Sequence, residues 1–281
     1  MTTTPRLAVT GSTGGLGGLV ARDLADRGVA QRLVVRSRDR APALPGTDVV
    51  EATYGDAEAM RRALEGVDTL LLVSASESAD RMREHRTAVS AAAEAGVGHV
   101  VYTSFLGAAP DCTFTLGRDH FATEQLVRES GLGFTFLRDS LYLDFMSFLA
   151  GEDGVIRGPA GDGRVAGVAR ADIARVAVAA LLDPGAHRDA TYDLTGPEAL
   201  TLHEVAALLT EATGRDVTFH DETEDEAYAS RASYGAPRWQ LDAWVSTYTA
   251  IRDGELDRVT DDVRRVTGRD PLSLRDVLSH R

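Results

Sequence analysis

Lysine is absent from this sequence of 281 residues, so all 30 of its basic residues are arginine. Any mechanism that depends on a lysine amine is therefore excluded. Cysteine is nearly absent too, because Cys112 is the only one. A single cysteine rules out an intrachain disulfide framework and a cysteine-based zinc cluster, and it fits a reducing compartment. Such a lone thiol is more often incidental than reactive.

Long apolar runs are missing as well. No stretch approaches the roughly 20 apolar residues that a membrane-spanning helix requires. The first residues, MTTTPRLAV, lack the basic region and the apolar core of a secretory signal. These features predict a cytoplasmic protein without a membrane partner.

Positive charge is scarce relative to negative charge, and the net charge is -13 at pH 7. Such a chain repels phosphate backbones and acidic lipid surfaces, and it has no basic stripe of the kind that nucleic-acid binders carry. The seven histidines do not have the spacing of a zinc site. We therefore expect neither a nucleic-acid partner nor a bound metal.

Short apolar runs alternate with helical patterns over the first two-thirds of the chain. The predicted strands are 6–10, 32–36, 48–52, 69–74, 99–104, 134–138 and 191–195. The predicted helices are 15–28, 57–66, 80–96, 119–131 and 171–183, several of them closed by glycine. Nearly continuous strands that alternate with helices predict an α/β fold with a Rossmann-like, doubly wound parallel sheet.

The pattern changes after about residue 196. The stretch TLHE predicts a capping box, because Thr201 can accept the backbone N–H of Glu204 while Glu204 reaches back. The helix that begins there runs to Thr213, and a strand at 216–220 and mostly helical segments follow. This part of the sequence predicts a smaller, mixed but mostly helical C-terminal lobe.

A glycine-rich stretch, TGSTGGLGG, joins the first strand to the first helix. Gly11, Gly14 and Gly17 have the spacing G-x-x-G-x-x-G. Their missing side chains permit a tight turn and a close approach to a pyrophosphate, and the helix N-terminus adds free N–H groups and a partial positive charge. At the start of a βαβ series this pattern predicts dinucleotide binding.

The second strand ends in VVRSRDR, where an NAD site often has an acidic residue. Arg36 and Ser37, followed by Arg38, favour the 2′-phosphate of NADP(H) instead. The alternative is that these arginines only solvate a surface loop. Asp56 follows the third strand, where it could accept the adenine amino group, cap the helix at 57–66, or do both.

Several motifs, in this order and spacing, resemble the NmrA-like group of atypical short-chain dehydrogenase/reductases. Within that group the sequence is most similar to bacterial NADPH-dependent quinone oxidoreductases and triphenylmethane reductases. The resemblance covers nearly the whole chain, and its motifs are TGSTGGLGG, VVRSRDR, YGDAEAM, HVVYTSFLG, RDHFATE and FTFLRDSLYLDF.

The resemblance implies that NADPH lies across the carboxyl ends of the strands. It assigns the 2′-phosphate to Arg36 and an adenine contact to Asp56. It assigns the pyrophosphate to Gly11, Ser12, Thr13, Gly14, Gly15, Leu16 and Gly17. On the ribose and nicotinamide side it implies Ser74, Ala75, Thr103 and Ser104, and near the nicotinamide and substrate it implies Ser140, Leu141 and Tyr142.

Typical members of the wider superfamily carry Tyr-x-x-x-Lys, in which the tyrosine donates a proton and the lysine lowers its pKa and holds the ribose. Here the same frame reads Leu116, His120 and Glu124, so both usual residues are replaced. His120 could hydrogen-bond the ribose or relay a proton. Alternatively it is an ordinary helix residue that fixes the loop at 105–117.

Chemistry without a strong protein acid suits such a site. Hydride transfer to a quinone or a cationic dye places charge in a delocalised system, so proximity and orientation would dominate catalysis. We predict an NADPH-dependent oxidoreductase that acts on a quinone-like or other conjugated aromatic acceptor. The catalytic candidates are His120 and Tyr142. The predicted pocket walls are Tyr142, Phe145, Trp239 and Trp244, although each of these aromatic residues could instead be a core residue.

The alternative function is a non-catalytic, NADP(H)-sensing regulatory protein of the NmrA type, which also needs no tyrosine and lysine pair. In either case we expect residues 1–140 with about 165–195 to form an NADP-binding Rossmann domain. Residues from about 141 to 164 with 196–281 would form a substrate-binding lobe. The sequence does not determine the assembly state, for which a homodimer is one expectation.

Overall fold

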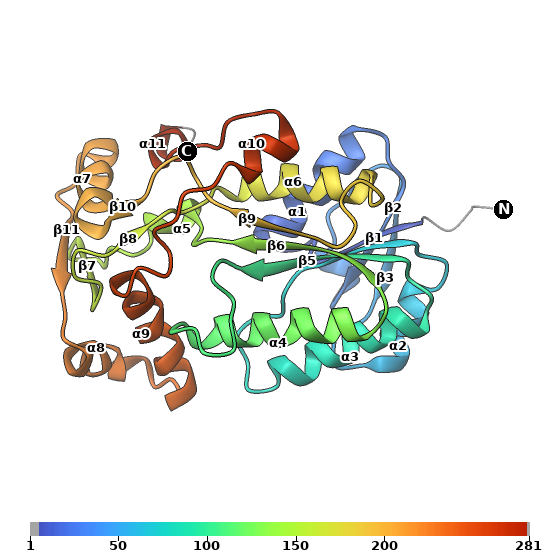
Figure 1. The fold of residues 1–281 in the computed structure, drawn as a ribbon, viewed down its shortest axis with the longest axis horizontal. Helices are drawn as coiled ribbons and strands as arrows, with labels where there is room; N and C mark the ends of the chain where they lie inside the picture. Colours follow the sequence, from blue (N-terminus) through green and yellow to red (C-terminus); the bar gives the residue numbers. More distant parts are fainter. Residues whose placement is uncertain (1–5, 280–281) are drawn as a thin grey trace. The chain divides into compact units, whose positions relative to one another are not determined.

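The computed structural model describes residues 6–279 of the chain. Seven strands form one sheet in the order β3-β2-β1-β4-β5-β6-β9 (Figure 1). Strand β1 pairs in parallel with β2 and β4, so Ala8 lies between Arg32 and Leu70. The strands are β1 Leu7–Thr10, β2 Gln31–Val35, β3 Thr47–Glu51, β4 Thr69–Leu72, β5 His99–Phe105, β6 Gly133–Asp139 and β9 Ala190–Leu194. All seven predicted strands are confirmed, and their ends agree within two residues.

By compactness the chain divides into two units. The first contains residues up to Ser104 together with 121–137 and 173–192, and the second contains 105–120, 138–172 and the chain from Asp193 onward. The division predicted from the sequence differs chiefly at residues 105–120. This segment groups with the second unit because Phe105 and Leu106 belong to the hydrophobic core of that unit.

Helices cover both faces of the sheet in the first unit. Strand residues of one parity, such as Leu70, Val100 and Phe136, pack with α2, α3 and α4 in one buried cluster. This is the two-residue alternation that strand geometry imposes. The opposite face is covered by α1 and α6 (Figure 1). The helices are α1 Gly15–Asp26, α2 Ala57–Leu64, α3 Arg81–Glu94, α4 Thr115–Glu129 and α6 Arg170–Leu182.

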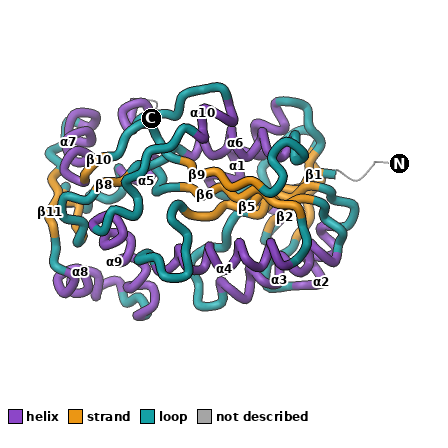
Figure 2. The backbone as a smooth tube through the Cα atoms, in the orientation of Figure 1, coloured by secondary structure: helices purple, strands orange, loops and turns teal. Residues whose placement is uncertain are grey.

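The second unit is mostly helix and loop, with four short strands (Figure 2). Strand β7 pairs in parallel with β11, and β8 pairs antiparallel with β10. The predicted strand at 216–220 is confirmed as β11, and β7, β8 and β10 were not predicted. The elements are α5 Leu143–Met146, β7 Val155–Gly158, β8 Arg164–Val165, β10 Leu200–Thr201, α7 Leu202–Thr213, β11 Thr218–Asp221, α8 Glu224–Arg231, α9 Arg238–Arg252, α10 Asp262–Thr267 and α11 Leu274–Ser279.

The predicted capping box at the start of α7 is confirmed. Thr201 accepts the backbone N–H of Glu204, and the Glu204 carboxylate accepts the backbone N–H of Thr201 at 2.8 Å. A second capping box, formed by Thr223 and Glu226, begins α8. Both boxes satisfy backbone donors that the first helical turn leaves unpaired.

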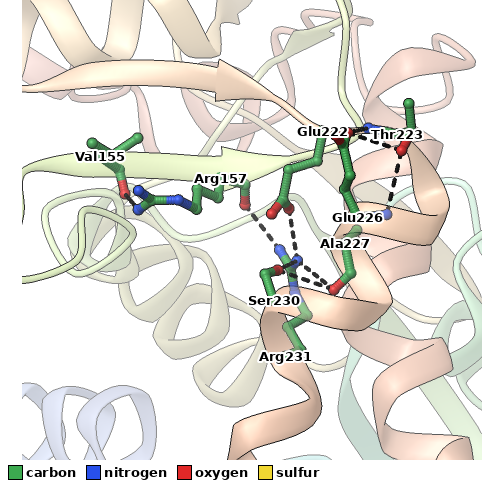
Figure 3. A network of polar contacts seen from close by, with 8 residues as sticks. All are labelled: Val155, Arg157, Glu222, Thr223, Glu226, Ala227, Ser230 and Arg231. Carbon is green, nitrogen blue, oxygen red and sulfur yellow. Dashed lines mark hydrogen bonds and ion pairs between the residues drawn. The ribbon is translucent and has the colours of Figure 1, made fainter.

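One buried ion pair ties α8 to the short strands beside it. The Arg231 guanidinium donates to Glu222 Oε2 at 2.9 Å and to the Arg157 carbonyl at 2.8 Å (Figure 3). It also donates to the carbonyl of Ala227, one turn earlier in α8. Because its bonds reach β7, the residue after β11 and its own helix, this arginine fixes how these elements pack.

Candidate functional site

The turn between β1 and α1 requires glycine at two positions. Gly11 has a φ of +65°, which favours glycine, and its carbonyl accepts the Gly14 N–H at 2.9 Å. A Cβ added at Gly17 would lie 2.4 Å from the Gly11 carbonyl oxygen. The third glycine of the motif is therefore required by the close packing of the helix against the turn.

The N-terminus of α1 offers unpaired donors. Its N-cap, Gly14, has no side chain to accept a hydrogen bond, and its first turn contains no acidic residue. Thr13, Gly14 and Gly15 are exposed, and Leu16 is buried beneath them. The Ser12 hydroxyl oxygen is buried and has no hydrogen-bond partner among residues 6–279. These groups fit a pyrophosphate, whose oxygens would accept hydrogen bonds from the backbone N–H groups and from the Ser12 hydroxyl.

The ends of β2 and β3 carry the residues predicted for the adenosine half of the cofactor. Arg36 follows β2 directly and is exposed, and Ser37 beside it is half-buried. Asp56 is the N-cap of α2, where its carboxylate accepts the Ala59 N–H at 2.9 Å. The capping role predicted for Asp56 is thus confirmed, and the adenine contact stays a prediction.

A buried histidine, His85, holds the segment after β4 through a hydrogen bond. The Ala75 N–H donates to Nε2 of His85 at 2.8 Å, and Nδ1 of the same ring lies 2.7 Å from the Thr123 hydroxyl. Since Nε2 accepts, Nδ1 carries the hydrogen and donates it to Thr123. Burial, and then the charge of Arg81, lower the pKa of His85 to about 3. The ring is therefore neutral and its tautomer is fixed.

The ends of β4 and β5 are held by side-chain hydrogen bonds. The Ser74 N–H donates to the Thr103 hydroxyl at 2.8 Å. Ser104 donates to Oε1 of Glu124 at 2.6 Å, and Glu124 is fully buried. Because Thr123 and Glu124 are neighbours in α4, one turn of this helix positions both the segment after β4 and the end of β5.

His120 lies one helical turn before Glu124. It is 7% exposed, and its ring stacks on Phe105 with 6.1 Å between the ring centroids. Leu116, one turn earlier still, takes the frame position where a tyrosine is usual. The imidazole therefore has a fixed packing partner at the end of β5, and its predicted ribose contact stays a prediction.

The loop that precedes His120 is anchored within the second unit. The Thr113 N–H donates to the carboxylate of Glu255 at 2.9 Å. Cys112 is buried, with Sγ 3.3 Å from the Phe114 carbonyl oxygen, and burial raises the pKa of its thiol. A Cβ added at Gly117 would lie 2.8 Å from that sulfur. The thiol therefore packs as a small apolar group, which agrees with an incidental and not a reactive cysteine.

The residues after β6 are fixed by their backbone. Ser140 donates its N–H to the Leu194 carbonyl at 3.0 Å, whereas its buried hydroxyl has no partner within the described chain. Leu141 accepts the Val168 N–H at 2.9 Å. A buried hydroxyl without a partner is costly unless a ligand satisfies it, so Ser140 fits the predicted cofactor contact.

The Tyr142 hydroxyl is hydrogen-bonded to Oδ2 of Asp139 at 3.2 Å. Asp139, the last residue of β6, is only 2% exposed. Burial raises the pKa of Asp139 well above its usual value, and the bond from Tyr142 opposes that shift only in part. The pKa of Tyr142 is raised too, by burial and then by Asp139. Apart from the position of Tyr142, no signal in the sequence pointed to this pair.

The structure brings two of the four predicted pocket walls together. Phe145 stacks on Tyr142 with 6.2 Å between centroids and is 52% exposed, so it is not a core residue. The Arg170 guanidinium lies 5.2 Å from the centre of the Phe145 ring. Trp239 and Trp244 lie on another helix, α9, where Trp244 packs edge-on against Tyr234.

Residues 6–279 lack two kinds of feature. No group of three or more histidine, cysteine, aspartate or glutamate residues there could hold a metal ion. No helix in the same range has both the length and the apolar character needed to cross a membrane.

A protein-family model described as NAD(P)H-binding matches residues 11–184 of the chain. Quinone oxidoreductase 2 of Escherichia coli K12 is 35% identical over 283 residues, which cover 98% of each chain. The crystal structure of the E. coli NADPH-dependent quinone oxidoreductase with NADPH has a TM-score of 0.88 and 34% identity, covering 98% of this chain and 99% of that one.

Two further relatives act on other conjugated compounds, by their names. The triphenylmethane reductase of Citrobacter sp. in complex with NADP(H) has a TM-score of 0.86 and 31% identity, covering 98% of this chain and 99% of that one. The NAD(P)H azoreductase of Xenophilus azovorans is 35% identical over 269 residues, which cover 94% of this chain and 93% of the relative.

Proposed function

The chain belongs to the NAD(P)H-binding family, and we propose that it is an NADPH-dependent oxidoreductase. It transfers hydride to a quinone-like or other conjugated aromatic acceptor without a Tyr-x-x-x-Lys pair. The observation that carries the proposal is the turn before α1, where no side chain caps the helix and the buried Ser12 hydroxyl has no hydrogen-bond partner within residues 6–279. A phosphate would satisfy both kinds of donor. The preference for NADPH over NADH rests on Arg36, which directly follows β2, where an NAD site often has a carboxylate.

The chain's own residues bind and orient the reactants. The glycine turn takes the pyrophosphate, and Arg36 takes the 2′-phosphate. His85 holds the segment after β4 and Glu124 holds the end of β5, and His120 positions the ribose. Bound NADPH supplies the hydride. With both reactants oriented, proximity accounts for most of the rate.

The acceptor class follows from the aromatic residues after β6. Tyr142 and Phe145 form a stacked pair with one half-exposed ring, and the Arg170 guanidinium lies against that ring. Flat, electron-poor rings bind such a surface by stacking. The names of the relatives support the same class, since quinones, azo dyes and triphenylmethane dyes are all conjugated.

The test is direct. Purified protein is mixed with NADPH and a panel of quinones, azo dyes and triphenylmethane dyes, and the absorbance of the reduced cofactor is followed. We expect turnover with at least one acceptor and weaker activity with NADH. Absence of turnover across the panel, with NADPH bound, would favour the NADP(H) sensor instead. A sensor would distinguish oxidised from reduced cofactor in binding without consuming it.

The cytoplasmic location and the homodimer stay predictions from the sequence. Fractionation of the source cells tests the first, and light scattering of the purified protein tests the second.

A further inference from the structure

An almost fully buried carboxyl group lies against the hydroxyl of Tyr142. Asp139 Oδ2 is 3.2 Å from that hydroxyl, and Oδ1 is buried without a hydrogen-bond partner in the part of the chain that the structure describes. A carboxylate with one oxygen unpaired in such an interior is strongly disfavoured relative to the neutral acid. The geometry therefore favours a protonated Asp139.

The nearest charged groups do not reverse the preference of Asp139 for its protonated form. The groups that act on Tyr142 are Asp139, Asp144 and Arg170. Arg170 is already engaged, since its Nε lies 3.1 Å from Oδ1 of Asp144 in an ion pair and its guanidinium covers the Phe145 ring. Its charge is thus largely neutralised by Asp144, and burial keeps the pKa of Asp139 raised.

A neutral Asp139 changes what Tyr142 can do. A phenol has one hydrogen to donate and lone pairs to accept with. Against a carboxylate, its hydrogen would be committed to Asp139. Against a carboxylic acid, the phenol oxygen can accept from Asp139, and its own hydrogen is released for an acceptor. Phe145, stacked on Tyr142 and half-exposed, offers a planar acceptor a surface beside that hydroxyl.

We propose that Asp139 and Tyr142 form the proton-donating pair of this reductase. This inference rests on the proposed function. Hydride addition converts a quinone into the hydroquinone monoanion. The O–H bond of Tyr142 breaks as its proton moves to that oxyanion, and the phenolate takes the proton of the Asp139 carboxyl. Water reprotonates Asp139 after release. Tyr142 is the catalytic residue, and Asp139 acts through it, in place of the missing Tyr-x-x-x-Lys pair.

Two acceptors separate proton donation from hydride transfer. A quinone requires one proton for each hydride, whereas a cationic triphenylmethane dye becomes neutral on accepting hydride and requires none. In Tyr142→Phe and Asp139→Asn we expect quinone turnover to fall by about 100-fold. Dye turnover and NADPH affinity should stay close to those of the wild type. Equal losses with both acceptors, or no loss with either, overturn the proposal.

A second readout needs no turnover. Infrared spectra of the protein alone at neutral pH should contain the C=O stretching band of a protonated carboxyl group. Asp139→Asn should remove this band, Tyr142→Phe should shift it, and Asp153→Asn, at an exposed carboxylate paired with Arg157, should leave it unchanged. Absence of the band in the wild type overturns the neutral Asp139. If the wild type shows the band but reduces neither acceptor, the proposed function is wrong, and the proton-donating role of Tyr142 is wrong with it.

Discussion

The backbone N–H of Ala75 donates to Nε2 of His85 across 2.8 Å, and the other ring nitrogen pairs with Thr123. Replacing His85 with leucine removes the acceptor of the Ala75 N–H and the ring nitrogen that donates to Thr123. We expect the free energy of unfolding to fall by about 1–3 kcal/mol. The KM for NADPH should rise because the segment after β4 loses its support, whereas kcat should change little.

The matched control is His220→Leu, at an exposed position on β11. It should change stability by less than about 0.5 kcal/mol and leave the KM unaltered. Urea unfolding and steady-state kinetics measure both effects. If His85→Leu behaves like the control, then His85 does not support the cofactor segment.

Acid should destabilise the protein through two buried histidines. Burial lowers the pKa of His85 to about 3 and that of His99 to about 4. In the unfolded chain both titrate near 6.5, so below that pH the unfolded state binds more protons. Their contribution to stability is complete above pH 6.5 and is lost as pH falls, to about 4 for His99 and to about 3 for His85. Each can contribute up to about 1.4 kcal/mol per pH unit in this window.

Asp139 acts in the opposite sense, because its raised pKa means that its contribution is lost as pH rises above the unfolded value. The histidine effect is therefore measured as a difference between proteins. Urea unfolding at pH 7.5 and 5 should give a smaller acid-induced loss in the double variant His85→Gln and His99→Gln than in the wild type. Identical losses in the two proteins would show that neither histidine is held neutral.

Cofactor preference should depend on Arg36. Replacing it with alanine removes a charge-assisted partner of the 2′-phosphate, so the KM for NADPH should rise about 10-fold or more. The KM for NADH should barely change, because NADH has no such phosphate. Arg62→Ala, at an exposed position on α2, is the control and should alter neither. A parallel loss with both cofactors would contradict the assignment.

The ion pair between Arg231 and Glu222 should matter far more than exposed pairs in the same unit. The two side chains are 11% and 4% exposed. Arg231→Met leaves a buried carboxylate unpaired, so we expect a loss of about 3–5 kcal/mol in unfolding free energy. Adding Glu222→Gln should restore part of it. Arg275→Met breaks an exposed pair with Glu211 and should cost less than about 1 kcal/mol. Thermal and urea unfolding decide between these outcomes.

The regular part of the fold could be predicted because its signals are local. Each strand of the large sheet is a short apolar run bounded by turn residues, and the capping box at Thr201 is readable within four residues. Strands β7, β8 and β10 were missed for a physical reason. They are only two to four residues long and are defined by partners far along the chain, as β7 is by β11.

The site, too, could be predicted only where its signals are local in the sequence. The glycine turn and the absence of lysine are visible in the sequence alone. The bonds of His85 to Ala75 and Thr123 are not, because 38 residues separate the ring from Thr123 and no spacing rule connects them. Asp139 reads as an ordinary polar residue at a strand end. Its burial, which depends on the rest of the fold, is what favours the protonated form of its carboxyl group.

Cys112 can report the local opening of the segment that precedes His120. It is the only thiol in the chain, and it is buried near Gly117 and the Phe114 carbonyl. A thiol reagent can reach it only when this segment opens locally. The rate at which this sulfur is labelled therefore reports the local opening of the stretch between β5 and α4, without an introduced probe or competing signal. Comparing that rate with and without NADPH shows whether the cofactor closes it.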